Sequence, residues 1–151
     1  MNTLRWRCVN SKGFVQDEIS FISRGVVCHV EFLVDGKAIG AHADGGVQVR
    51  QINHYDADYR FKADCTDEQY ASAVSFLMDQ VGKPYDFLNI FGIMVSRDWH
   101  DPNRWICSEL WAAVMEAGGL IHKLESALSL ITPQDTLLIS SAMFEREYIT
   151  D

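Results

Sequence analysis

The chain has 151 residues, of which 48% are hydrophobic, and its 13 basic and 21 acidic side chains give a net charge of −8. This length and apolar content predict one globular domain over residues 1–151 and exclude a disordered chain. The acidic balance, without a cluster of Lys and Arg, argues against binding to nucleic acid or to an anionic membrane. No apolar stretch approaches the ~18 residues that a membrane-spanning helix needs, so no transmembrane segment is expected.

Four cysteines, Cys8, Cys28, Cys65 and Cys107, are spread along the chain without a C-x-x-C pair. This spacing gives no support to a zinc ribbon or a thioredoxin-type site. The N-terminal segment lacks the apolar core and the small-residue cleavage site of a secretory signal. We therefore expect a cytoplasmic protein whose thiols are reduced.

The first half of the chain has the composition of strands separated by turns. The expected strands are Leu4–Val9, Val26–Val34, Lys37–Ala43, Val47–Ile52 and Asp58–Ala63. Asp35-Gly36 and Asp44-Gly45-Gly46 separate the middle three, which predicts an antiparallel meander. The segment Val15–Ser23 fits either a short helix or an extended strand.

The second half of the chain carries helix start and stop signals. Thr66 is a good N-cap, with Gln69 at the capping-box position, and Gly82 ends that helix. Its expected apolar positions are Tyr70, Val74, Leu77, Met78 and Val81.

Three further helices are expected in this half. One begins at Asp86, one begins near Cys107 and ends at Gly118-Gly119, and a short one begins at Thr132-Pro133. The predicted fold class is therefore α+β, with a small antiparallel sheet, a barrel-like meander, packed against helices.

Two histidines are placed together by the Asp35-Gly36 turn. Asp-Gly is typical of a two-residue type I′ hairpin, in which Val34 faces Lys37 and the numbers of facing residues add to 71. His29 then faces His42, and their rings should be neighbours on one face. Alternation puts Cys28 on the other face, so a Cys28–His29 pair is not expected. Without other evidence, a surface position or a structural hydrogen bond is the simpler explanation of the two histidines. No further ligand spacing accompanies them, so no metal site is expected.

Cys107 differs from the other cysteines because it stands at a helix start. Unpaired N–H groups and the positive end of the helix dipole stabilise a thiolate there. A nucleophilic Cys also needs a base within reach and a group that orients the base, which His29 and His42 could supply. Packing alone is the expectation for Cys8, Cys28 and Cys65, and it is the alternative for Cys107.

Four segments together resemble a known family: SRGVVCHVEFLVDGKAIGAHADGGVQVR, GKPYDFLNIFG, WICSELWAAVMEAGGL and ITPQDTLL. They are similar to the YiiX/YaeF-like group of circularly permuted NlpC-type papain-like cysteine hydrolases. Enzymes of the lecithin:retinol acyltransferase type are more distant relatives. In the permuted branch the His strand precedes the Cys helix, as His29 precedes Cys107 here. The likeness spans roughly Arg24 to Leu138.

The resemblance implies a circularly permuted papain-like fold in which Cys107 is the nucleophile, His29 the general base and His42 the orienting residue. Tyr85, in the GKPYD segment, matches a tyrosine near the site and is expected to contact substrate. Glu31 departs from the family, where an apolar residue or Gly is usual.

The expected activity is hydrolysis of an amide, in a peptide or an acylated small molecule, through an acyl-enzyme and without a cofactor. A lipid acyltransferase or thioesterase on the same site is one alternative. A non-catalytic binding module of the same fold is another.

Overall fold

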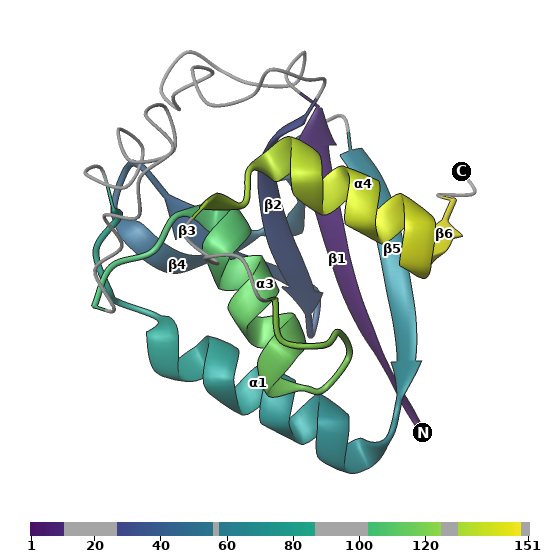
Figure 1. The fold of residues 1–151 in the computed structure, drawn as a ribbon. Coiled ribbons are helices and arrows are strands. Elements are labelled where there is room, and N and C mark those ends of the chain that lie inside the picture. The colour runs from purple at the N-terminus through teal and green to yellow at the C-terminus, as the bar shows by residue number, and fades with distance from the viewer. Residues whose placement is uncertain (11–26, 56–57, 87–102, 125–129, 149–151) are drawn as a thin grey trace.

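The computed structural model describes residues 1–10, 27–55, 58–86, 103–124 and 130–148 (Figure 1). The strands in these ranges are β1 (Asn2–Asn10), β2 (Val27–Val34), β3 (Lys37–His42), β4 (Gly46–Gln51), β5 (Asp58–Cys65) and β6 (Glu145–Glu147). The helices are α1 (Asp67–Gln80), α3 (Cys107–Ala117) and α4 (Pro133–Met143), together with the 3₁₀ turn η2 (Ile52–His54).

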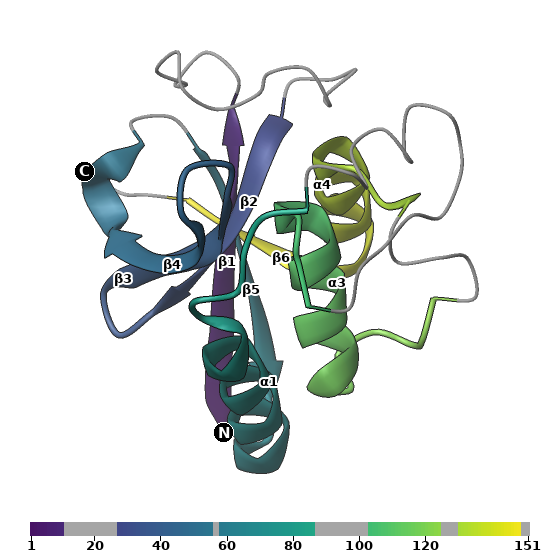
Figure 2. The ribbon, with the colours of Figure 1, turned by 90° about the vertical axis from the view of Figure 1, so that its left-hand side faces the viewer.

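The strands form one antiparallel sheet in the order β4-β3-β2-β1-β5-β6. The predicted α+β class and the β2–β3–β4 meander are therefore confirmed. The sheet is open, with β4 and β6 at its edges, and it does not have the barrel-like form that we expected. Figure 2 shows α3 and α4 on the same side of this sheet, and α1 packs against α3.

The predicted β2–β3 hairpin is present with the expected register. Asp35 and Gly36 have φ angles of 49° and 72°, as a type I′ turn requires at both central positions. Val34 faces Lys37, and the described pairs continue to Phe32 opposite Ile39. The turn chemistry alone therefore fixed which residues of the two strands meet.

The edge strand β6 was not predicted from the sequence. Its three residues, Glu145, Arg146 and Glu147, are all charged and have low β-propensity. Pairing with β5 makes it a strand, and ion pairs support it: Lys62 Nζ lies 3.1 Å from Glu145, and Arg5 Nε lies 3.0 Å from Glu147. Two other predictions, the segment Val15–Ser23 and the helix following Asp86, lie outside the described residues.

The helices begin where the cap signals predicted. Thr66 and Thr132 each form a capping box with the residue three positions later. In α1, Leu77 is buried as expected, but Met78 is 45% exposed and Val81 is 36% exposed, so the apolar face is narrower than predicted. Val81 is the C-cap of α1 and has a non-helical backbone conformation, so it does not continue the apolar face of the helix.

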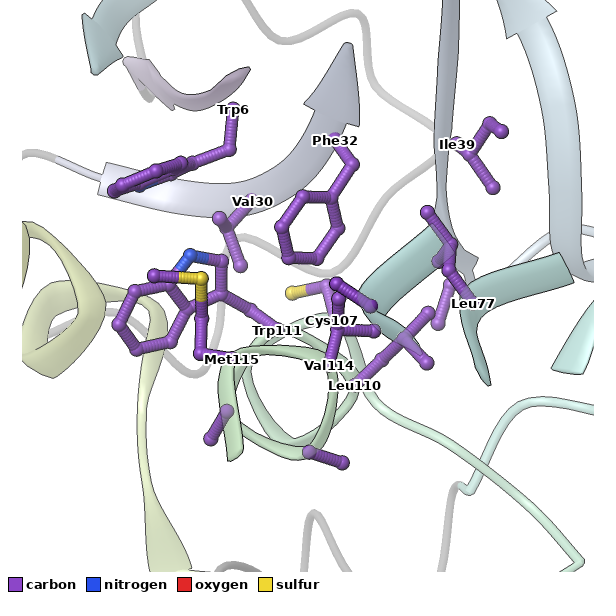
Figure 3. Packing of buried hydrophobic residues seen from close by; sticks show 14 of the residues in the cluster. Trp6, Val30, Phe32, Ile39, Leu77, Cys107, Leu110, Trp111, Val114 and Met115 are labelled. Carbon is purple, nitrogen blue, oxygen red and sulfur yellow. The ribbon is translucent and has the colours of Figure 1, made fainter. Parts of the chain in front are cut away.

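The core lies between the sheet and the helices. Trp6 of β1 stacks on Phe61 of β5, and its ring centroid is 6.1 Å from that of Trp111 in α3. Figure 3 shows Val30 and Phe32 of β2 directed at the side chains of α3. Trp6 and Cys8 of β1 and Val30 and Phe32 of β2 therefore face the helices, and Arg7 and Glu31, which alternate with them, face the other side.

None of the helices in the described ranges combines the length and the apolar character that crossing a membrane would require.

The Thr66 cap gives a direct test of how α1 begins. Thr66 Oγ1 accepts the Gln69 N–H at 3.1 Å, and the Gln69 side chain accepts the Thr66 N–H at 3.0 Å. We expect Thr66→Ala to lower the free energy of unfolding by about 1 kcal/mol, because a helix N–H loses its acceptor. Urea denaturation measures this change. Thr66→Ser keeps the hydroxyl and should stay within about 0.5 kcal/mol of wild type; equal losses in both variants would contradict the capping role.

Candidate functional site

Buried polar side chains gather on the face of the sheet that α3 and α4 do not cover. Arg7, His29, Glu31 and His42 are each at most 3% exposed. Their neighbours Trp6 and Cys8 contact Ser140 and Thr136 of α4, so strand alternation directs Arg7 to the opposite side. A group of polar residues this deeply buried needs internal hydrogen bonds and compensating charges.

An ion pair between neighbouring strands anchors this cluster. Arg7 of β1 and Glu31 of β2 are direct register partners. Glu31 Oε1 lies 2.7 Å from Arg7 Nε and 2.6 Å from Nη2, and Arg7 Nη1 donates to Asp58 at 3.1 Å. The guanidinium therefore holds one oxygen of Glu31 and leaves the other, Oε2, to different partners.

The two histidines approach that second oxygen. Glu31 Oε2 is 3.3 Å from His29 Nε2 and 3.5 Å from His42 Nε2. The ring centroids of the two imidazoles are 4.5 Å apart, which confirms the proximity predicted from the hairpin register. Tyr55, which follows η2, places its hydroxyl 3.4 Å from His42 Nδ1. Glu31 is thus the group to which both imidazoles are directed.

Glu31 is held as a carboxylate. Burial by itself raises the pKa of a carboxyl group. Here the hydrogen bonds from His29 and His42 and the nearby charges of His29 and Arg7 outweigh burial and lower the pKa of Glu31 far below 4.5. At neutral pH the site therefore contains a carboxylate beside two imidazoles.

Gly40 of β3 makes room for this carboxylate. A Cβ added at Gly40 would lie 2.9 Å from the Glu31 Cβ and 3.2 Å from the Val30 carbonyl oxygen. Both distances are closer than ordinary packing permits, so a larger residue would push Glu31 away from β3. The glycine therefore belongs to the construction of the site.

Cys107 is the first residue of α3 and is 6% exposed. Figure 3 shows its thiol beside Val30 and Phe32, which alternate along β2 with His29 and Glu31. The structure thus joins His29 to His42 through Glu31 and sets Cys107 on the apolar side of the same strand. The described β2–β3 pairs run from Val34 opposite Lys37 to Phe32 opposite Ile39.

Main-chain hydrogen bonds tie the segment before Cys107 to the histidine hairpin. The Val47 N–H donates to the Lys83 carbonyl at 2.9 Å, and the Gly82 N–H donates to the Val47 carbonyl at 2.8 Å. A Cβ at Gly46 would collide with the same Lys83 carbonyl. The β3–β4 turn and the loop after α1 are therefore packed backbone to backbone.

The loop after α1 then continues the connection to α3. The Trp105 N–H donates to the Pro84 carbonyl, and the Asp86 N–H donates to the Trp105 carbonyl, each at 3.1 Å. Tyr85, 8% exposed, forms a parallel bridge with Trp105. The predicted site tyrosine is thus paired with Trp105, which precedes Cys107 by two residues. Glu109 accepts the Ile106 N–H at 3.2 Å and caps the helix that Cys107 opens.

Two other cysteines are buried in the core, as the packing prediction expected. Burial raises the pKa of Cys8 to about 12, against a smaller lowering by the Thr136 hydroxyl. Cys65 lies 3.6 Å from the Asn2 carbonyl oxygen. The side chain of Cys28 lies outside the described structure.

Sequence reasoning missed the roles of Arg7, Glu31 and Tyr55. Two signals for them were present in the sequence. Alternation placed Glu31 on the face of His29, and Arg7 is a charged residue inside an apolar strand between Trp6 and Cys8. What was missing was the pairing of β1 with β2, which sets Arg7 opposite Glu31.

This third residue also changes what the cluster could hold. His29, Glu31 and His42 each offer one metal-ligand atom, and these three atoms lie within 4.8 Å of one another. The sequence prediction counted only the two histidines as donors, which is why no metal site was expected there.

The depressed pKa of Glu31 predicts how stability depends on pH. A carboxyl group whose folded pKa lies below its unfolded value of 4.5 stabilises the protein above that pH, and this stabilisation is lost as the pH falls. Glu31→Gln should therefore cost about 3–5 kcal/mol of unfolding free energy at neutral pH, since it removes one partner of a buried ion pair. The difference from wild type should narrow steadily below about pH 4.5.

Urea denaturation across that pH range measures the difference. Asp58→Asn is the matched control, because it also takes a carboxylate from Arg7 but leaves Glu31 and both histidines in place. The control should keep the acid-dependent loss that Glu31 causes. Parallel curves for wild type and Glu31→Gln would show that Glu31 is not held as a carboxylate.

Comparisons with known proteins give a fold likeness. No family model matches the chain, and no curated protein matches it. A solved structure described as the metalloprotein YiiX from Escherichia coli O157:H7 is similar, with a TM-score of 0.62 and 15% sequence identity. The likeness covers 97% of this chain and 96% of that chain. At this identity it shows a shared fold, so the chain adopts a YiiX-like α+β fold along nearly its whole length.

Proposed function

We propose that this protein is a cysteine-dependent hydrolase of amides with a circularly permuted papain-like fold. Two independent lines support the proposal. The segments around His29, Tyr85 and Cys107 resemble such hydrolases in order and spacing, and the structure is similar to YiiX over 97% of the chain. The functional roles below come from the residues themselves, because fold alone does not define an activity.

One observation carries the proposal: the contact of His29 Nε2 with the ionised Glu31, at 3.3 Å. A general base in a cysteine hydrolase needs one ring nitrogen for the thiol and a polar partner that orients the other. Glu31 engages Nε2, so Nδ1 is the nitrogen assigned to proton transfer. In this proposal Glu31 takes the orienting role that the family resemblance gave to His42, and His42 and Arg7 hold Glu31.

The position of Cys107 supports its role as nucleophile. The N–H groups of the first turn of a helix have no acceptors within their own helix, and they favour a thiolate and a developing oxyanion. α3 packs against β2, the strand that carries His29, and the loop with Tyr85 pairs beside Trp105. Cys107 faces the apolar side of β2 and His29 faces the other side, so in this mechanism the thiol and the imidazole meet around the N-terminal end of the strand.

The reaction then proceeds in two steps. His29 takes the proton of the Cys107 thiol, the sulfur attacks the amide carbonyl, and the same proton passes to the leaving amine as the C–N bond breaks. A water molecule, deprotonated by His29, attacks the thioester and releases the acid and the free thiol. The Cys107 backbone N–H stabilises the tetrahedral oxyanion in both steps.

Peptide amides are the substrate class we propose. The first alternative is a lipid acyltransferase or thioesterase that acts through the same site. The second alternative is a binding module that has the same fold and no turnover. Hydrolysis assays on peptide amides and on lipid esters separate the first two activities. Absence of turnover on both panels, together with an unreactive Cys107, identifies the binding module.

The proposal is tested first by thiol reactivity in the folded protein. At about pH 6, iodoacetamide should label Cys107 well before Cys8, because an activated thiolate reacts and a buried thiol with a pKa of about 12 does not. Mass spectrometry of the labelled protein assigns the site. His29→Ala should slow the labelling of Cys107 at least about tenfold, because it removes the group that takes the thiol proton.

Turnover is tested with matched cysteine variants. Cys107→Ala should abolish hydrolysis while the circular dichroism spectrum stays that of the wild type. Cys65→Ala is the control, since Cys65 is a buried thiol at the end of β5 with no assigned role. Full turnover by Cys107→Ala, or labelling of Cys107 no faster than that of Cys8, would contradict the proposed function.

A further inference from the structure

We propose that His29, Glu31 and His42 form a binding site for one divalent transition metal ion of the zinc type. Binding there and the proposed function of His29 as general base exclude each other. The site proposal depends only on the geometry of the cluster. Its inhibitory consequence rests on the proposed function.

The donor atoms already stand at the separations that a metal ion requires. Glu31 Oε2 is 3.3 Å from His29 Nε2 and 3.5 Å from His42 Nε2. In a tetrahedral zinc site with bonds of about 2.0–2.1 Å, neighbouring ligand atoms are about 3.3–3.4 Å apart. An ion can therefore take the place of the protons between Glu31 and the two imidazoles, with only small movements of the three side chains.

Partners of the three ligands stand where a metal site needs them. Arg7 holds Glu31 through Oε1 alone, which leaves Oε2 for the ion and fixes the carboxylate plane. The Tyr55 hydroxyl lies 3.4 Å from Nδ1 of His42, the nitrogen opposite the one directed at the metal. Hydrogen bonds of this kind orient metal-binding imidazoles and carboxylates.

The ligand set and the charges decide which ions fit. Two imidazoles and one carboxylate suit Zn²⁺, Co²⁺ and Cu²⁺, whereas Mg²⁺ and Ca²⁺ prefer oxygen ligands only. The positive charge of Arg7 already neutralises the charge of Glu31 and repels a metal cation. Arg60, which forms an ion pair with Asp58, adds a second positive charge nearby. We therefore expect weaker binding than in structural zinc sites, with a dissociation constant on the order of 1 µM.

A metal ion at His29 Nε2 changes what that ring can do. Neutral imidazole bound through Nε2 carries its remaining proton on Nδ1. That nitrogen then has no lone pair with which to take the proton of Cys107, so the metal-bound enzyme lacks its base. The ion is a reversible inhibitor that acts through the tautomer of His29.

The test measures metal binding directly on the full chain. Isothermal titration with Zn²⁺ should give one ion per chain, both for the folded protein and for protein refolded with the ion. His42→Ala should weaken binding at least about 100-fold, because one of three ligands is lost. His122→Ala, which removes an exposed histidine outside the cluster, should bind as wild type does. Circular dichroism confirms that each variant is folded.

Two further measurements separate this site from adventitious binding by thiols. Tyr55→Phe removes one hydroxyl and keeps the ring, so it should fold and weaken Zn²⁺ binding about tenfold. Co²⁺ bound at the cluster should show no sulfur-to-metal charge-transfer absorption and the same spectrum in Cys107→Ser. Absence of binding in both native and refolded protein overturns the inference, as does binding that His42→Ala leaves unchanged or that involves a thiolate.

Activity provides a separate readout. Zn²⁺ at saturating concentration should abolish hydrolysis, and a chelator should restore it. Full hydrolysis by protein with the ion bound contradicts the inhibitory consequence. A protein that binds one ion at the cluster but shows no hydrolysis even when it is free of metal refutes the proposed function and leaves the metal site standing.

Discussion

The ion pair between Arg7 and Glu31 is the interaction on which the polar half of the molecule depends. Neither charge is accessible to water, so each is tolerated only in the presence of the other. Because the two residues are direct partners across β1 and β2, the pair also fixes how these strands are aligned. The carboxylate that results is ionised, rigid and shared by both histidines.

The sheet divides the protein into two chemically different sides. Its helix-facing side is apolar and carries Trp6, Val30 and Phe32 against α3, as Figure 3 shows. Its other side carries the charged cluster. β2 contributes to both sides through simple alternation, so one eight-residue strand supplies core contacts and the proposed base. A shift of one residue in the register of β2 would exchange these two sets of side chains completely.

Local features of the sequence predicted much of this arrangement. The Asp35-Gly36 turn predicted the register of β2 and β3 beside the turn and the proximity of His29 to His42, and Thr66 and Thr132 marked the starts of two helices. These signals act over a few residues, so one sequence is enough to read them. The spread of β-rich segments also gave the fold class correctly.

The missing parts of the prediction depend on contacts that are remote in the sequence. β1 lies between β2 and β5, and nothing local indicates that position. Without it, Arg7 had no partner, and Glu31 was only a departure from a family pattern. The edge strand β6 likewise owes its conformation to β5 and to two ion pairs rather than to its own residues. In both cases pairing across the sheet overrode or completed the local signal.

The backbone bonds between the β3–β4 turn and the loop after α1 have an evolutionary consequence. They run from Val47 to Lys83 and from Pro84 to Trp105, and so connect the His42 hairpin to the start of the Cys107 helix. Main-chain donors and acceptors persist whatever side chains occupy these positions, apart from Gly46, where a Cβ has no room. Most side-chain substitutions therefore leave the distance between the His42 hairpin and the start of the Cys107 helix unchanged. This is one way in which a fold can be retained when only 15% of residues are identical between two chains.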